Sequence, residues 1–108
     1  MSLSTHVLDT SSGKPAGAVP IRLTFSGLPL FEGVTNGDGR CPALSDLALH
    51  KGVYRLEFRV ADYFRKAGCQ LSDPPFVDLI AIEFGMADGH YHVPLLVSPY
   101  GYSTYRGS

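Results

Sequence analysis

Histidine and tyrosine side chains gather near the end of the chain, in His90-Tyr91-His92 and in the final Tyr105-Arg106-Gly107-Ser108. The side chains of His90 and His92 are two residues apart, so a β-strand would place both on one face. Imidazole titrates near neutral pH, with a reference pKa of ~6.5, and can therefore donate or accept protons in hydrolysis. With a third histidine, His6, in another predicted strand, this pattern predicts an acid–base site.

The same histidines also fit a second kind of site. A His-x-His pair with a third histidine elsewhere is a ligand set for an open zinc centre that activates water. No acidic residue is evidently placed to orient such ligands. A zinc-dependent hydrolase is therefore an alternative, and the preferred interpretation is hydrolysis without a metal or cofactor.

Three other functional motifs do not match this sequence. Gly101–Tyr105 lacks the closing glycine of a nucleophile elbow. Gly13-Lys14 is followed by proline, where a phosphate-binding loop needs Ser or Thr. Asp38 lies in a glycine-rich turn without the other ligands of a calcium loop. Since no nucleophilic side chain is activated by a motif, water is the expected attacking group.

The elements that must position these residues have a hydrophobic period of two. Alternation of this kind predicts strands in Leu3–Leu8, Ile21–Phe25 and Val53–Val60. The glycine-rich segment Thr35–Arg40 predicts a turn, and only Asp62–Gly68 predicts a helix, with Asp62 as a candidate cap. An all-β, antiparallel two-sheet β-sandwich of about eight strands with one short helix is therefore expected.

Two further segments predict association. The expected strands Phe76–Phe84 and His92–Val97 are apolar on both faces, which a two-sheet sandwich satisfies only when an outer face is also covered. An oligomer is therefore expected.

Length and charge limit the classes of function. A chain of 108 residues is expected to form a single domain, residues 1–108. A net charge of −1 provides no basic stripe for nucleic acid. No segment resembles a membrane span or a secretory signal, so a cytoplasmic protein is expected. Cys41 and Cys69 lack a CxxC spacing and are expected to be reduced thiols.

Both ends of the chain resemble the transthyretin family. His6–Ile21 is similar to its N-terminal signature, and Tyr91–Thr104 is similar to its C-terminal signature. The ending Tyr105–Ser108 resembles the branch of 5-hydroxyisourate hydrolases of urate degradation, whereas the hormone-carrier branch lacks it. The resemblance implies hydrolysis of 5-hydroxyisourate by a homotetramer whose sites lie at the dimer–dimer interface. A non-catalytic small-molecule carrier of the transthyretin type is the alternative.

The resemblance also implies which residues act. His6, Arg40, His92 and Ser108 match catalytic positions, and substrate-binding positions match the set His6, Arg40, Tyr105, Arg106 and Gly107. The two histidines would move protons, in an order that the sequence leaves open. The guanidinium of Arg40 would bind ureide oxygens and stabilise negative charge on the attacked carbonyl.

Overall fold

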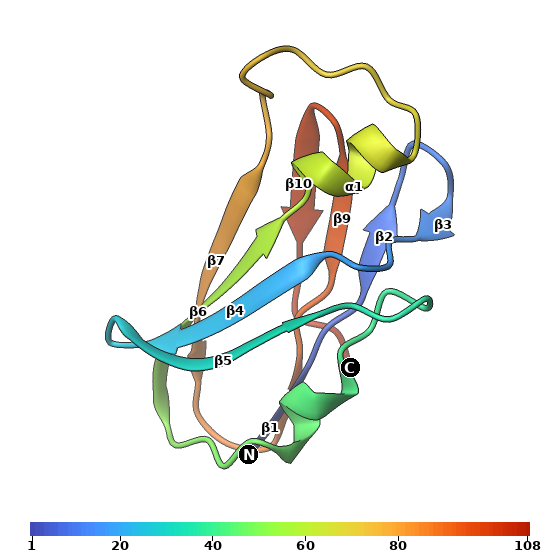
Figure 1. The fold of residues 1–108 in the computed structure, drawn as a ribbon. Coiled ribbons are helices and arrows are strands. Elements are labelled where there is room, and N and C mark those ends of the chain that lie inside the picture. Colours follow the sequence, from blue (N-terminus) through green and yellow to red (C-terminus); the bar gives the residue numbers. More distant parts are fainter.

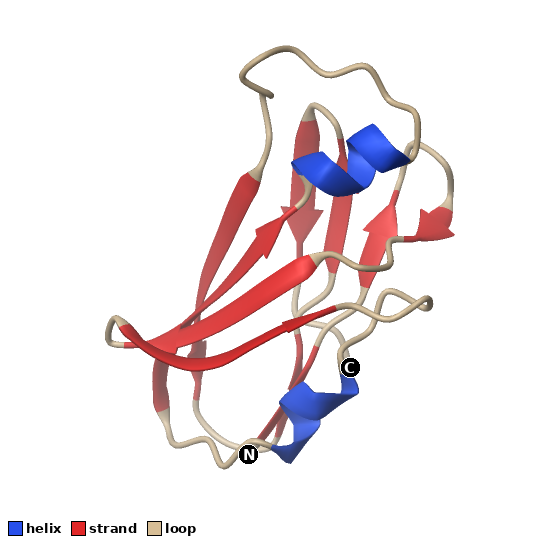
Figure 2. Ribbon diagram, viewed as in Figure 1, coloured by secondary structure: helices blue, strands red, loops and turns tan.

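Strands dominate the computed structural model, which describes residues 1–108 (Figures 1 and 2). In chain order the elements are β1 (Ser2–Ser4), β2 (Val7–Asp9), β3 (Lys14–Pro15), β4 (Pro20–Phe25), β5 (Leu28–Val34), the 3₁₀ helix η1 (Pro42–Asp46), β6 (Gly52–Arg59), α1 (Ala61–Lys66), β7 (Leu79–Met86), β8 (His90–His92), β9 (Leu95–Ser98) and β10 (Gly101–Thr104).

Two four-stranded sheets form the sandwich, with strand orders β10-β9-β2-β3 and β5-β4-β6-β7 (Figure 1). A two-stranded sheet, β1-β8, continues the first of them past short breaks at Thr5-His6 and Val93-Pro94. When each broken strand is counted once, the ten strands become about eight, and the predicted all-β sandwich is confirmed.

The strand directions differ from the prediction in one place. The pairs β1–β8 and β2–β9 are parallel, whereas the other paired strands are antiparallel. The predicted antiparallel sandwich is therefore confirmed for most strand pairs, but the pairs that the N-terminal strands form are parallel. Hydrophobic alternation specifies which face of a strand is buried, but it carries no information about the direction of the neighbouring strand.

The predicted alternation is confirmed in the strands that lead to the site. In the first predicted strand, Leu3, Thr5 and Val7 are buried, while the side chains between them are half-buried. In β6 the same pattern buries Tyr54, Leu56 and Phe58 against the opposite sheet. Packing against the core therefore fixes which face of the N-terminal strand is buried, and His6 lies on the opposite face.

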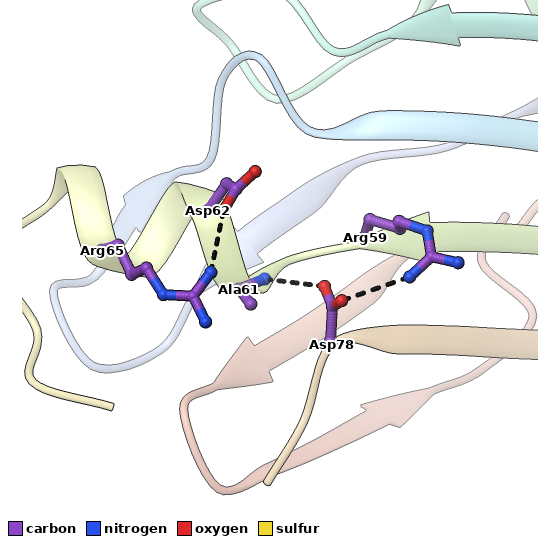
Figure 3. A network of polar contacts seen from close by, with 5 residues as sticks. All are labelled: Arg59, Ala61, Asp62, Arg65 and Asp78. Atoms are coloured by element: carbon purple, nitrogen blue, oxygen red, sulfur yellow. Dashed lines mark hydrogen bonds and ion pairs between the residues drawn. The ribbon is translucent and has the colours of Figure 1, made fainter. Parts of the chain in front are cut away.

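Helix α1 begins differently from the expectation (Figure 3). Asp62 lies inside the first turn, where it pairs with Arg65 at 2.9 Å, and is not the cap. The Ala61 N–H instead donates to the Asp78 carboxylate at 3.2 Å, and Arg59 donates to the other oxygen of that carboxylate at 3.2 Å. A residue far along the chain therefore satisfies this helix terminus.

Three other expectations need correction. The sequence indicated one helix, but a 3₁₀ helix, η1, also forms, with Pro42 in its first turn. The predicted strand His92–Val97 is interrupted at Pro94, which cannot donate to a ladder. The strand predicted at Phe76–Phe84 begins only at Leu79, and Glu83 interrupts its outer face.

Neither cysteine forms a disulfide; Cys41 is buried and Cys69 is half-buried. None of the helices combines the length and apolar character needed to cross a bilayer.

Candidate active site

A tight turn brings Arg40 to His6. The turn carbonyl of Gly39 accepts the Val7 N–H at 2.8 Å, and His6 and Arg40 pair as an isolated antiparallel bridge. Gly39 has a φ of +73°, and a Cβ there would collide with the Val7 carbonyl oxygen. Only glycine therefore allows the turn to approach the strand so closely.

The side-chain amide of Asn36 shapes the same turn. Its Oδ1 accepts the N–H groups of Asp38 at 3.0 Å and Arg40 at 3.1 Å. This arrangement is an Asx turn, in which a short polar side chain replaces a backbone acceptor. These bonds hold the backbone of Arg40 beside the N-terminal strand, while its side chain is exposed.

Parallel strand pairing brings His92 to the same region. Ser4 is the register partner of His92, and the His6 carbonyl accepts the Leu95 N–H at 2.9 Å. His6 and His92 therefore come from adjacent segments of one sheet, although 85 residues separate them in the sequence. Both side chains are half-buried, so they combine a fixed position with access to solvent.

The charges around His92 favour its neutral form. Burial lowers the pKa of the His92 imidazole, and the nearby Arg40, His6 and His90 lower it further. Because the usual value is ~6.5, the imidazole is neutral at pH 7 and can accept a proton. The interaction with Arg40 also indicates that the cation and both histidines share one electrostatic environment.

A hydrogen-bonded row of side chains extends from His92 to the surface. The His92 Nδ1 lies 2.8 Å from the Ser4 Oγ, which also lies 3.0 Å from the His90 Nε2. The His90 Nδ1 lies 2.6 Å from the Ser2 Oγ. Ser2 and Ser4 were not predicted as site residues, because serine in a strand has no signature and neither segment alone indicates that β1 pairs with β8.

The C-terminal tail touches His92 through Gly107. Its N–H donates to the His92 carbonyl at 2.7 Å, and a Cβ on Gly107 would lie 2.5 Å from the His92 Cδ2. Ser108 follows at this edge and is exposed. The backbone of the tail thus lies directly against the imidazole.

The structure does not bring the side chains of Tyr105 and Arg106 to His6 and His92. The Arg106 guanidinium carbon lies 3.8 Å from the centroid of the Tyr91 ring, a cation–π geometry, and a guanidinium nitrogen donates to the His90 carbonyl at 3.4 Å. Tyr105 and Arg106 line a surface cavity of about 240 Å³ next to β7. In the single chain, then, the tail reaches the site through Gly107.

The three-histidine zinc centre lacks a ligand set in this chain. No three His, Cys, Asp or Glu side chains lie together in an arrangement that could hold a metal ion. The row of serine and histidine side chains occupies the Nδ1 atom of His92 and both ring nitrogens of His90. The arrangement therefore suits proton transfer to and from water, close to the Arg40 cation.

Three similar proteins have nearly the same length as this chain. A curated "5-hydroxyisourate hydrolase" of Ralstonia nicotianae is 52% identical over 98% of this chain and 97% of its own. The solved 5-hydroxyisourate hydrolase of Klebsiella pneumoniae is 39% identical, with a TM-score of 0.87 and full coverage of both chains. Sea bream transthyretin, solved with thyroxine, is 30% identical, with a TM-score of 0.84 over 99% of this chain and 95% of its own.

A sequence model described as "HIUase/Transthyretin family" matches residues 3–107. This range contains His6, Arg40, His92 and Gly107. The chain therefore belongs to the HIUase/Transthyretin family.

Proposed function

We propose that residues 1–108 form one hydrolase domain that opens the ring of 5-hydroxyisourate to give 2-oxo-4-hydroxy-4-carboxy-5-ureidoimidazoline. The observation that carries this proposal is the convergence of His6, Arg40 and His92 at one place on the outer face of a sheet. It is supported by relatives of the same length that are named 5-hydroxyisourate hydrolases.

The chemistry is amide-type hydrolysis by water. The neutral His92 takes a proton from water as the oxygen bonds to the acyl carbon, and the Arg40 guanidinium stabilises the negative charge that develops on the carbonyl oxygen. The carbon–nitrogen bond then breaks, and His6 protonates the departing ring nitrogen. A proton passed from His92 to His6 through solvent restores the starting state.

We further infer that the working site is assembled by a homotetramer, at the interface between dimers. In the single chain Arg40 is exposed, and His6 and His92 are half-buried on the outer face of their sheet. A flat ureide bound there would remain in contact with water on one side. A second subunit covering this face would exclude that water and strengthen the electrostatic interactions within the site. Light scattering should give a mass four times that of the 11.7 kDa chain.

Turnover separates the hydrolase from the carrier. Uricase generates 5-hydroxyisourate in situ, and the decay of its ultraviolet band is followed with and without this protein. We expect accelerated decay, and we expect His92→Asn to lose about 10²–10⁴-fold in kcat/KM because acid–base help is removed. His50→Asn, at an exposed histidine in a loop after η1, is the matched control. Binding of the ureide without faster decay would assign the chain to the carriers.

Chelation separates the metal-free reaction from the zinc alternative. We expect full activity after dialysis against a chelator, because water is activated by an imidazole in this proposal. Activity that falls on dialysis and returns with zinc would instead favour the metal centre.

A further inference from the structure

The row Ser2, His90, Ser4 and His92 alternates hydroxyl and imidazole groups without a gap. Its three contacts measure 2.6, 3.0 and 2.8 Å, all within hydrogen-bond range. The parallel register of β1 and β8 creates it, since Ser2 faces His90 and Ser4 faces His92. The half-buried His92 is thereby connected to an exposed imidazole.

Such a row has two complete arrangements of protons. In one, the His92 Nδ1–H donates to Ser4, the Ser4 hydroxyl donates to the His90 Nε2, and the His92 Nε2 is free to accept a proton. In the other, every donor and acceptor is reversed, and the His92 Nε2 carries a proton that it can donate. Serine allows both because its hydroxyl is a donor and an acceptor and can rotate.

We propose that Ser4 and His90 are positioning residues that relay protons for His92 and set its tautomer. This proposal rests on the proposed function, in which His92 exchanges protons with water. It adds a route by which the charge gained at His92 leaves the site before the next proton transfer.

The relay step is balanced within the row. Water gives a proton to the His92 Nε2; the His92 Nδ1 proton passes to the Ser4 oxygen; the Ser4 hydroxyl proton passes to the His90 Nε2. The products are a neutral His92 that carries its proton on Nε2 and a His90 imidazolium at the surface. Solvent then removes the Nδ1 proton of His90. Before the next turnover the row runs in reverse: His90 regains an Nδ1 proton from solvent, its Nε2 proton passes through Ser4 to the His92 Nδ1, and the His92 Nε2 proton passes to His6 through solvent. No oxidant, metal or other reactant is required.

The surrounding charges favour movement in this direction. A positive charge on His92 is unfavourable, because the side chain is partly buried and because Arg40 and His6 lie nearby. His90 is exposed to solvent, although Arg106 contacts its carbonyl oxygen. A positive charge is therefore better hydrated on His90 than on His92.

Substitutions at Ser4 and His90 distinguish a proton relay from a purely structural role of these residues. Ser4→Thr keeps a hydroxyl in the strand, whereas Ser4→Ala removes it. His90→Gln keeps a hydrogen-bonding group near the Nε2 position but cannot hold a transferred proton. Ser72→Ala and His50→Gln, at exposed loop positions, are matched controls.

The kinetic test follows kcat and KM across pH, and in mixtures of light and heavy water. We expect Ser4→Ala and His90→Gln to lower kcat about 10- to 100-fold with little change in KM, a part of the 10²–10⁴-fold typical of acid–base catalysis. Ser4→Thr should restore most of kcat. A plot of kcat against the fraction of deuterium should be curved in the wild type, because several protons move in one step. It should be linear in Ser4→Ala, where only one proton moves. A His90→Gln variant with wild-type kcat and a curved dependence would overturn the relay.

A spectroscopic test keeps this proposal separate from the proposed function. Nitrogen-15 NMR of the free protein reports the tautomer of His92 without substrate. We expect Ser4→Ala to change the tautomer balance of His92 and to uncouple its shifts from the titration of His90, while Ser72→Ala leaves both unchanged. An unchanged His92 spectrum in Ser4→Ala would refute the relay. Absence of turnover in the wild type would refute the proposed function alone.

Discussion

Replacing Gly107 by alanine is expected to disable the site while leaving the fold intact. The added Cβ would lie 2.5 Å from the His92 Cδ2, 3.2 Å from its Cγ and 3.3 Å from its Cβ. Non-bonded carbon atoms sit at roughly 3.5–4.0 Å, so the alanine requires a movement of about 1 Å. The backbone of Gly107 does not adopt a positive φ, and the penalty therefore falls on the contact with the imidazole.

Either way of relieving this clash damages the site. If the His92 ring turns, its 2.8 Å contact with the Ser4 Oγ is lost; if the tail moves, the 2.7 Å bond from the Gly107 N–H to the His92 carbonyl is lost. A misplacement of about 1 Å typically costs 10²-fold in rate. This corresponds to about 2.7 kcal/mol of additional barrier.

The assay compares kcat/KM for 5-hydroxyisourate, together with the melting temperature and oligomer mass. Gly101→Ala is the matched control, since nothing lies within 4 Å of a Cβ at that position of β10. We expect Gly107→Ala to lose about 100-fold in kcat/KM with a melting temperature near that of Gly101→Ala. A Gly107→Ala enzyme with the kcat/KM of Gly101→Ala would show that the tail does not position His92.

Three other predictions concern the charge beside His92, the C-terminal tail and the buried Asp9 carboxylate. Arg40→Gln should raise the pKa of His92 toward its usual value, because a nearby positive charge is removed; NMR titration measures it, and an unchanged pKa would contradict the shared environment of the two groups. Deleting Tyr105–Ser108 should remove most of the activity but little stability, because these residues are mainly exposed; activity assays and thermal melts check both effects. Tyr63→Phe should cost about 1–2 kcal/mol of unfolding free energy by urea titration at pH 7, because the hydroxyl that donates to the buried Asp9 carboxylate is lost, without changing kcat/KM.

The pH dependence of the Tyr63→Phe effect can be given a sign. Burial by itself raises the pKa of the Asp9 carboxyl, but hydrogen bonds from Ser11, Tyr63 and Ser12 outweigh it, and the net pKa is lowered. A carboxyl with a lowered folded pKa contributes stability above its unfolded value of ~3.9. That contribution is lost as the pH falls through the folded pKa. The difference between wild type and Tyr63→Phe should therefore shrink below about pH 4.

Local patterns in the sequence predicted much of the fold. The alternation in Val53–Val60 depends only on neighbouring residues, and the strand β6 confirms it. The turn that ends at Arg40 was also predicted, because glycine and asparagine tolerate its backbone angles. What local patterns could not supply was the partner of each strand, and the parallel pairs were missed for this reason.

The candidate site, too, contains residues that could be predicted from the sequence and residues that only their neighbours in space identify. Residues with distinctive chemistry, His6, Arg40 and His92, were selected from the sequence, and the structure places them together. Ser4 was not selected, since a serine hydroxyl acquires its role only from the imidazoles that β8 places beside it. The cap of α1 was misassigned for a related reason: Asp62 is adjacent in sequence, but Asp78 is adjacent in space.

The parallel pairing of the first strands with β8 and β9 has a consequence for biosynthesis. Val7 pairs with Leu95, so one edge of the N-terminal strand has no partner until almost the whole chain has been translated. At 5–20 residues per second, that interval lasts roughly 4–18 s. The meander of β4, β6 and β7 can form earlier, because its strands are close in sequence. A nascent chain thus carries an N-terminal strand with one unpaired edge behind a largely formed sheet, and His6 and His92 meet only when synthesis is nearly complete.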